Sequence, residues 1–158
     1  MCFGRMDIRV LALAGLGLWC LCRLVFEESP GSREYVPLVI SYSQKKMKLL
    51  ALRDTGNSLR DPITGRQALV LCAGAASRLT GLSLEQIRDP LATMAEQPVP
   101  GLRILPYRTV GQGSSLMLAM VFEDVELDGR KQKTLVAFAP ENFGAQEAYQ
   151  ALAGGICS

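Results

Sequence analysis

MKLLALRDTGNSLRDPITGRQALVLC, residues 47–72, consists of two apolar runs separated by a segment of small and polar residues. Met47–Leu52 is predicted as a β-strand that delivers the chain into Asp54–Asn57 (DTGN), where these residue types require a tight loop. Asp61–Gly65 carries proline and glycine at turn spacing, and Ala68–Cys72 follows as a short apolar strand. The stretch therefore predicts a carboxylate held in a loop between two strands.

Asp54 is the candidate catalytic residue of this loop. Aspartic peptidases need two carboxylates about 3 Å apart that share one proton, so that one deprotonates a water while the other protonates the scissile carbonyl. The chain contains a single D-T-G triplet and no D-S-G triplet. We therefore expect a homodimer in which each subunit contributes one Asp54 across a two-fold axis.

The neighbours of Asp54 have expected tasks in such a site. The Thr55 hydroxyl is suited to hydrogen-bond across the dimer, Gly56 lets the backbone approach the carboxylates, and Asn57 offers an amide that can orient Asp54. Strand alternation places Arg53 on the opposite face. The competing interpretation is an ordinary Asx-type turn, because Asp, Gly and Asn are common turn residues.

Outward from this loop, the pattern predicts mostly β structure with one interrupted helix. Tyr35–Tyr42 is a predicted strand in which Pro37 suggests an edge position and Lys45 and Lys46 mark the turn that follows. Ser83–Gln86 matches a capping box, and apolar residues at helical spacing (Leu84, Ile87, Leu91 and Met94) predict one helical face that Asp89-Pro90 breaks or kinks.

A hairpin with a glycine-rich tip is predicted further along the chain. Arg103–Val110 and Leu116–Leu127 are strand-like runs on either side of GQGSS. Asp128-Gly129 is a two-residue turn signal before another strand, Lys133–Ala139. The candidate residues for a flap or for contact with substrate are Tyr107, Arg108, Gly111 and Gly113. For Tyr107 and Arg108, a role in packing the hairpin is an equally weighted alternative.

Composition excludes several kinds of site. The 158 residues include no histidine, which rules out Ser-His and Cys-His nucleophilic sites and His-containing zinc sites. The 17 basic and 15 acidic residues, with a net charge of +2, are scattered along the chain and form no basic patch, so no nucleic-acid partner is expected. The five cysteines form no C-x-x-C pair, which favours reduced thiols in a cytoplasmic setting, with Cys72 in the core. We expect no cofactor or metal, since the scattered carboxylates are interpreted as surface charges: Asp61, Glu123, Asp124, Glu126 and Asp128.

The N-terminal region is predicted as a separate part. Val10–Cys22 is a run of thirteen uncharged residues, short for a bilayer span of about twenty. We expect residues 1–26, with one short apolar helix, to be a membrane anchor or a remnant of a transmembrane region, with a signal peptide or a buried helix as alternatives. Residues 27–34 form the linker, and residues 35–158 form the domain that carries Asp54.

Three separated stretches resemble a known family. ALRDTGNSLRDPITG (Ala51–Gly65), RILPYRTVG (Arg103–Gly111) and AYQALA (Ala148–Ala153) are similar to the peptidase domain of the sporulation sigma-E factor processing peptidases, over about Tyr35–Leu152. The resemblance implies a retropepsin-like closed β-barrel that acts as a homodimer, with Asp54 as the catalytic residue and Gly111–Gly113 in the flap.

The resemblance also implies a biological setting. The substrate would be an inactive sigma factor precursor that loses its N-terminal pro-sequence, and a signal protein would activate the peptidase. The chain would lie at the cell membrane, with its peptidase domain on the cytoplasmic side in the mother cell. Two alternatives stay open: a catalytically silent retropepsin-like module that dimerises or binds peptide at the membrane, and a membrane-tethered adaptor whose DTGN is only a turn.

Overall fold

The structure is a computed structural model that describes residues 33–96, 99–108, 113–143 and 148–154. The chain divides into two units, Met1–Arg33 and Glu34–Ser158, and the strands and helices named here lie in the second. The predicted apolar helix within residues 1–26 lies outside the described residues. Among the residues that are described, no helix has the length and apolar character needed to span a membrane.

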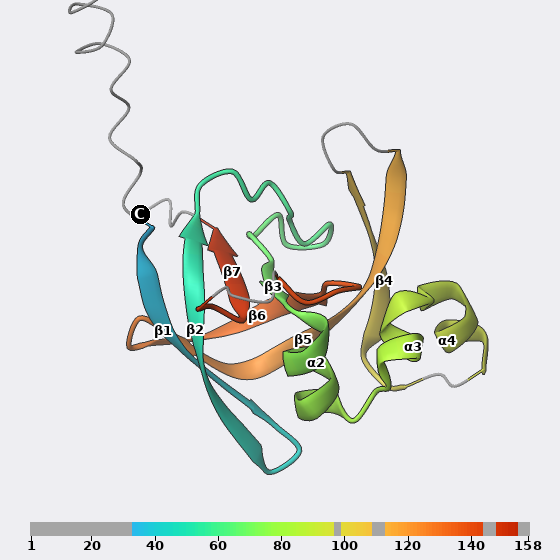
Figure 1. Cartoon of the computed structure of the whole chain (residues 1–158), viewed down its shortest axis with the longest axis horizontal. Coiled ribbons are helices and arrows are strands. Elements are labelled where there is room, and N and C mark those ends of the chain that lie inside the picture. Colours follow the sequence, from blue (N-terminus) through green and yellow to red (C-terminus); the bar gives the residue numbers. More distant parts are fainter. Residues whose placement is uncertain (1–32, 97–98, 109–112, 144–147, 155–158) are drawn as a thin grey trace, which may run out of the picture. The chain divides into compact units, whose positions relative to one another are not determined.

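The second unit is built around one sheet that closes on itself. In the described residues seven strands follow the order β1-β2-β7-β3-β6-β5-β4, and β1 also pairs with β5. Six strands therefore form a closed barrel from which β4 extends beside β5 (Figure 1). The strands are β1 (Tyr35–Tyr42), β2 (Lys45–Asp54), β3 (Leu69–Leu71), β4 (Leu102–Arg108), β5 (Ser114–Leu127), β6 (Arg130–Phe138) and β7 (Ala151–Gly154). The predicted mostly-β fold class is confirmed, and the closed barrel is consistent with a retropepsin-like domain.

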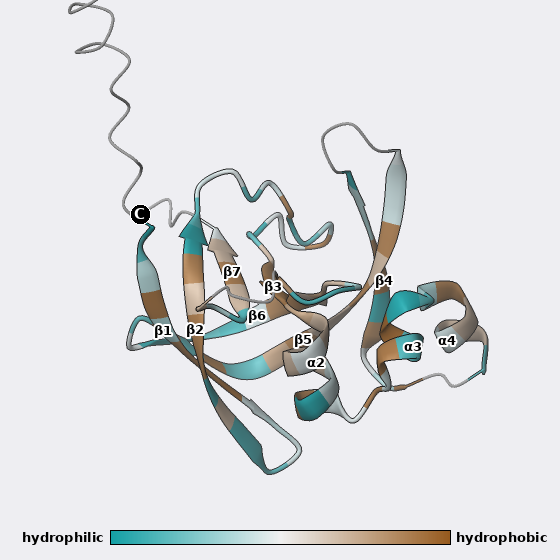
Figure 2. Ribbon diagram, in the orientation of Figure 1, coloured by the Kyte–Doolittle hydropathy of each residue, from teal (hydrophilic) through white to brown (hydrophobic). Residues whose placement is uncertain are grey.

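Apolar residues, brown in Figure 2, occur along the strands of the barrel, and they form one cluster on each face of the β5–β6 part of the sheet. Leu118 and Phe122 of β5 point into the main core, where the ring of Phe122 meets that of Phe138 edge-on at 6.4 Å between centroids. Met117 and Ala119, on the opposite face of β5, belong to a second cluster that also contains Ala68, Leu105, Leu135 and Ala137. Because side chains alternate along a strand, a continuous apolar run serves two cores.

The turns of the barrel correct two details of the sequence interpretation. The β1–β2 turn is made by Ser43 and Gln44, both with positive φ, so the prediction that Lys45 and Lys46 mark it was wrong. The edge position of Pro37 was also wrong, because β1 pairs with β2 on one side and with β5 on the other. Proline is tolerated there because the ladder to β5 begins only at Leu38.

The predicted turn between β5 and β6 is confirmed. Asp128 and Gly129 both adopt positive φ, at 51° and 75°, between the paired residues Leu127 and Arg130. This is the backbone that a two-residue hairpin turn requires.

In the described part of the segment between β3 and β4 there are three short helices: α2 (Ala73–Thr80), α3 (Leu84–Arg88) and α4 (Pro90–Glu96). The predicted capping box forms, since Ser83 Oγ accepts a hydrogen bond from Gln86 N and Gln86 Oε1 accepts one from Ser83 N. The predicted break at Asp89-Pro90 is confirmed, and it reorients α4, so Leu91 is exposed instead of sharing one buried face with Ile87. Leu84 is exposed as well, whereas α2 follows β3 directly and was not predicted.

Candidate active site

Asp54 is the last residue of β2, and its neighbour across the sheet is Gly154 of β7. β7 runs parallel to β2 and antiparallel to β3, so it lies between the strand that ends in Asp54 and the strand that follows the loop. This short strand of small residues was not predicted from its own pattern. The only sequence signal for it was the similarity of AYQALA to the family named above.

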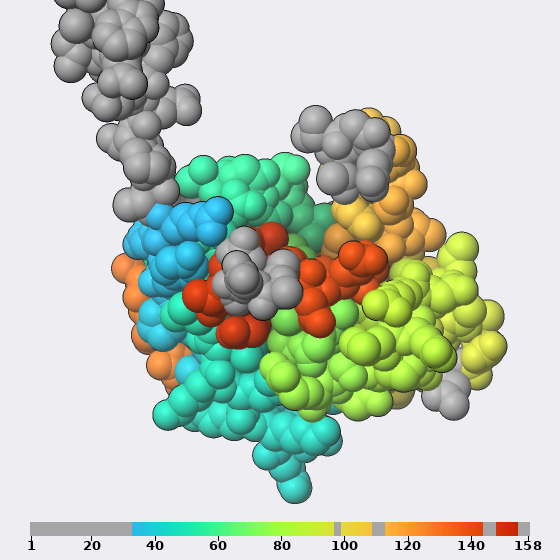
Figure 3. Space-filling view, in the orientation of Figure 1, coloured from blue at the N-terminus to red at the C-terminus, as the bar shows by residue number. Residues whose placement is uncertain are grey.

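A turn holds the Asp54 carboxylate at the start of the loop. Gly56 N donates to Asp54 Oδ1 at 2.9 Å, and Asn57 N donates to the Asp54 carbonyl oxygen at 3.2 Å. A Cβ on Gly56 would stand only 3.2 Å from Asp54 Oδ1, so glycine gives the carboxylate its close approach to backbone. Asp54 is partly buried, whereas Thr55 and Gly56 are exposed. The segment that follows β2, green in the space-filling view, lies at the surface (Figure 3).

Asn57 fastens this loop to the barrel and does not contact the Asp54 carboxylate. Its Nδ2 donates to the Ala68 carbonyl oxygen at 3.2 Å, and its Oδ1 accepts from Leu59 N at 3.0 Å. The expectation that the Asn57 amide orients Asp54 directly was therefore wrong. Instead, both polar atoms of the Asn57 side chain hydrogen-bond to backbone groups and so fix the path of the loop.

Gln67 forms a second attachment, which sequence reasoning missed. Its Nε2 donates to the Asn57 carbonyl oxygen. The side chain crosses directly over Gly154, where an added Cβ would lie 1.7 Å from Gln67 Cδ. Only glycine at position 154 leaves room for this crossing. Gln67, which lies just before β3, thus holds the Asp54 loop, and its position requires the glycine at residue 154 of β7.

Arg53 points away from the carboxylate of its neighbour, as strand alternation predicted. Its guanidinium contacts Glu34 at 2.9 Å and Asp128 at 3.4 Å. These contacts connect the end of β2 to the start of β1 and to the β5–β6 turn. Because the carboxylates of Glu34 and Asp128 are more than half exposed, we assign the ion pairs little stabilising energy.

Tyr107, Arg108 and Gly113 lie at the turn end of the β4–β5 hairpin. Tyr107 pairs with Ser115 and Arg108 with Ser114, while Gly111 lies outside the described residues. Tyr107 packs against the second apolar cluster, and Arg108 and Gly113 are exposed. The ends of β4 and β5 rise on the same side of the barrel as the loop that follows β2 (Figure 1).

The other acidic candidates are separated. Glu123 pairs with Lys133 at 2.6 Å and Asp124 with Lys131 at 4.0 Å, while Asp61 is enclosed by its own turn. Within the described ranges no three His, Cys, Asp or Glu side chains gather closely enough to hold a metal ion. Cys72 is a buried free thiol.

Asp61 has a pKa below its usual value of 3.8. The main cause is the hydrogen bond from Ile63 N, followed by that from the Thr64 hydroxyl, and burial opposes the shift less strongly. Both hydrogen bonds favour the carboxylate in the folded state. Asp61 therefore contributes stability that is fully present above the usual value and is lost as the pH falls through the lower folded pKa.

We expect Asp61→Asn to lower the free energy of unfolding by about 1 kcal/mol near neutral pH. The difference from the wild type should shrink as the pH falls from 3.8 through the lower folded pKa, where the carboxylate of the folded wild type becomes protonated. Urea unfolding at a series of pH values measures this. Asp124→Asn, which removes an exposed carboxylate, is the control and should change little. A constant difference for Asp61→Asn at every pH would contradict the assignment.

A sequence model of a protein family, described as sporulation factor SpoIIGA and classed among the peptidases, matches residues 7–154. The chain belongs to this family. It is also similar to the sporulation sigma-E factor-processing peptidase of Priestia megaterium (strain ATCC 12872 / QMB1551), with 22% identity over 130 residues. This match covers 75% of the chain and 42% of the relative, so the chain spans about two fifths of that protein's length. The family match includes Asp54, its loop and β7.

Proposed function

We propose that this chain is an aspartic endopeptidase that removes the N-terminal pro-sequence of a sporulation sigma factor precursor. The observation that carries the proposal is Asp54, placed in a glycine turn at the end of β2 beside β7, in a chain of a peptidase family. The substrate is suggested by the relative that is named a sigma-E factor-processing peptidase.

The geometry of the Asp54 loop supports a half-site. Gly56 N occupies Oδ1 of Asp54, and no hydrogen bond within the described part of the chain engages Oδ2. A second Asp54 across a two-fold axis would face this oxygen, and the two carboxylates would share one proton. Exposed Thr55 is available to hydrogen-bond to the partner loop. The homodimer then supplies the general base and the general acid that peptide hydrolysis needs.

The hairpin of β4 and β5 is suited to cover a bound peptide. Its turn end rises on the side of the Asp54 loop (Figure 1), and the exposed residues Arg108 and Gly113 flank residues 109–112. We assign Arg108, Gly111 and Gly113 to the flap. Tyr107 supports the flap by packing against the second apolar cluster.

The proposed cellular setting rests on the apolar run Val10–Cys22 and on the resemblance to the sporulation sigma-E factor processing peptidases. We propose that residues 1–26 anchor the chain at the cell membrane and that residues 27–34 link them to a peptidase domain at 35–158. This domain would face the cytoplasm of the mother cell, and a signal protein would activate it. No cofactor takes part in the proposed reaction, and nucleic acid is not among the proposed partners.

A catalytically silent module at the membrane is the second candidate. Asp54 Oδ1 accepts a hydrogen bond from Gly56 N, as in an ordinary Asx turn, so the loop is also compatible with a purely structural role. Such a module would dimerise or bind peptide without cleaving it.

Incubation of the purified full chain with a sigma-E precursor, followed by mass spectrometry, tests the proposal. We expect one shortened product that lacks the N-terminal pro-sequence. A precursor that binds but stays intact would favour the silent module.

Mixing experiments test the half-site arrangement. If each active site needs two Asp54 residues, an equal amount of Asp54→Ala chain exchanged into the wild type lowers activity per wild-type chain to about half, since random pairing makes half of the wild-type chains heterodimeric. Addition of more wild-type chain is the control. Unchanged activity per wild-type chain, with exchange verified by differently tagged subunits, would show that one chain suffices.

A further inference from the structure

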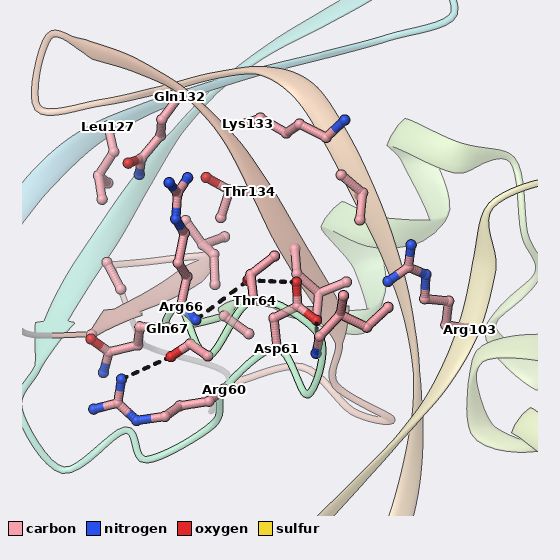
Figure 4. Close-up of a pocket in the computed structure, with 18 residues that line it drawn as sticks. Arg60, Asp61, Thr64, Arg66, Gln67, Arg103, Leu127, Gln132, Lys133 and Thr134 are labelled. Carbon is pink, nitrogen blue, oxygen red and sulfur yellow. Dashed lines mark hydrogen bonds between the residues drawn. The ribbon is translucent and has the colours of Figure 1, made fainter.

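A cleft of about 580 Å³ lies between the hairpin Arg60–Gln67 and the strands β4, β5 and β6 (Figure 4). We name it the β6 cleft. Its lining includes the apolar residues Leu69, Val121 and Leu135, which we call its apolar floor. At one end it reaches Gly154, the residue paired with Asp54 in the sheet. The cleft is large enough for several side chains, since ligand pockets measure about 300–1,000 Å³.

The charges that line the β6 cleft are mostly positive: Arg60, Arg66, Arg103 and Lys133 against the single carboxylate of Asp61. Some of this charge is already engaged. Lys133 pairs with Glu123, Arg60 Nη1 donates to the Gly65 carbonyl oxygen, and the Asp61 oxygens accept from Ile63 N and Thr64 Oγ1. Across the described residues, neither Arg66 nor Arg103 lies within 4.0 Å of a carboxylate oxygen. The charge of Arg103 helps to lower the pKa of Asp61, but neither guanidinium group forms an ion pair. Both groups can therefore still bind an anionic ligand.

Thr134 provides an independent observation on the β6 wall. Thr134 is 8% exposed, and its buried Oγ1 has no hydrogen-bond partner in the described structure. A buried hydroxyl without a partner is unfavourable, so a native protein rarely keeps one without a reason. In Figure 4 the Arg66 side chain extends from the hairpin toward Gln132 and Thr134. An acceptor placed there would meet a guanidinium and a free hydroxyl together.

We propose that the β6 cleft binds an acidic segment of the polypeptide substrate, with substrate carboxylates held by Arg66 and Arg103 and aliphatic side chains on the apolar floor. This assignment rests on the proposed peptidase function. Gly154 lines the cleft and is the sheet partner of Asp54, so a substrate chain bound at Asp54 would extend into the cleft with residues on one side of its scissile bond. The arrangement selects substrates by charge as well as by apolar contact.

Peptide binding to the full chain carrying Asp54→Ala tests the proposal without the need for cleavage. The probe is a fluorescein-labelled peptide in which glutamate alternates with leucine, and its reference is the same peptide with glutamine. We expect anisotropy to show about tenfold tighter binding of the glutamate peptide, and Arg66→Glu or Arg103→Glu to remove this preference. Arg88→Glu, at the end of α3 and outside the cleft, is the matched control and should leave it intact.

Equal binding of the two peptides, or a glutamate preference that survives both cleft substitutions, would overturn the proposal. Displacement of the glutamate peptide by inorganic phosphate, but not by chloride at the same ionic strength, would assign the cleft to a small anion instead. If the wild type cleaves the precursor but the glutamate and glutamine peptides bind equally, the peptidase function stands and only the cleft proposal is rejected. If the glutamate peptide binds more tightly but no cleavage occurs, only the peptidase function is rejected.

Thr134→Val gives a second, separate measurement. Valine keeps the volume of threonine and removes the unpartnered hydroxyl, so the melting temperature should stay equal or rise. The glutamate peptide should bind about threefold more weakly, because its carboxylate loses one donor. A lower melting temperature with unchanged peptide affinity would show that the hydroxyl serves the fold, which contradicts the proposal.

Discussion

Asp54→Ala is expected to reduce precursor cleavage about ten-thousandfold, to the background of the assay. The substitution removes the group that takes a proton from water in one subunit and the group that donates a proton in the other. Because Asp54 lies at the end of β2 and is only partly buried, the barrel should still fold. A cleavage time course with purified full chain measures the loss, and a thermal melt checks the fold.

Asp54→Asn is the sharper variant, because it keeps an acceptor for Gly56 N while it removes the ionisable group. We expect the same loss of cleavage with an unchanged melting temperature. Asp124→Asn, on the exposed face of β5, should retain full activity. If the asparagine variant cleaves as fast as Asp124→Asn, Asp54 is a turn residue and the aspartic mechanism is wrong.

Gly154→Ala has the second largest expected effect. An added Cβ would lie 1.7 Å from Gln67 Cδ, so the Gln67 side chain must leave its place above β7. Its hydrogen bond to the Asn57 carbonyl oxygen is then lost. We expect the free energy of unfolding to fall by about 1 kcal/mol for this bond. Cleavage should fall more, about tenfold to a hundredfold, because a small displacement of the Asp54 loop misaligns the catalytic pair.

A double-variant cycle separates this effect from general damage. Gln67→Ser removes the same attachment without adding a Cβ to β7, so it should lose about as much activity as Gly154→Ala. The combined variant should be no worse than either, because both changes remove one shared interaction. Gly81→Ala, which strains the positive-φ residue that ends α2 outside the site, is the matched glycine control: it should cost about 1 kcal/mol of stability and leave cleavage unchanged. Additive losses in the double variant would show that Gln67 does not hold the loop.

Local signals were sufficient for much of the barrel. Tyr35–Tyr42 was predicted with the bounds that β1 has, because its alternating burial follows from strand geometry. The capping box at Ser83, the break at Asp89-Pro90 and the turn at Asp128-Gly129 are each encoded within a few residues. The catalytic proposal for Asp54 likewise rests on a short motif and stays a prediction.

Other features could not be predicted because their cause lies far away in the chain. α2 has no side-chain cap, so no start signal marked it, and it packs through small residues. Pro37 suggested an edge because proline lacks the N–H that a central strand needs. The prediction was wrong because β1 pairs with β5 through residues about ninety positions apart, and no local pattern reveals that pairing. The Asn57 side chain hydrogen-bonds to the backbone of Ala68 and Leu59. These contacts could not be predicted because they depend on how the loop folds back onto the start of β3.

The sequence by itself determined that a carboxylate stands in a glycine loop after an apolar strand, since strand periodicity and turn chemistry are local properties. Only the tertiary structure decided what surrounds that loop. β7 has four residues with no readable period, yet it lies between β2 and β3 and brings Gly154 beside Asp54. The crossing of Gln67 over that glycine and the unpartnered hydroxyl of Thr134 arise from the same long-range packing. Such contacts depend on which strands become neighbours, and the strand pairing is fixed by the closure of the barrel.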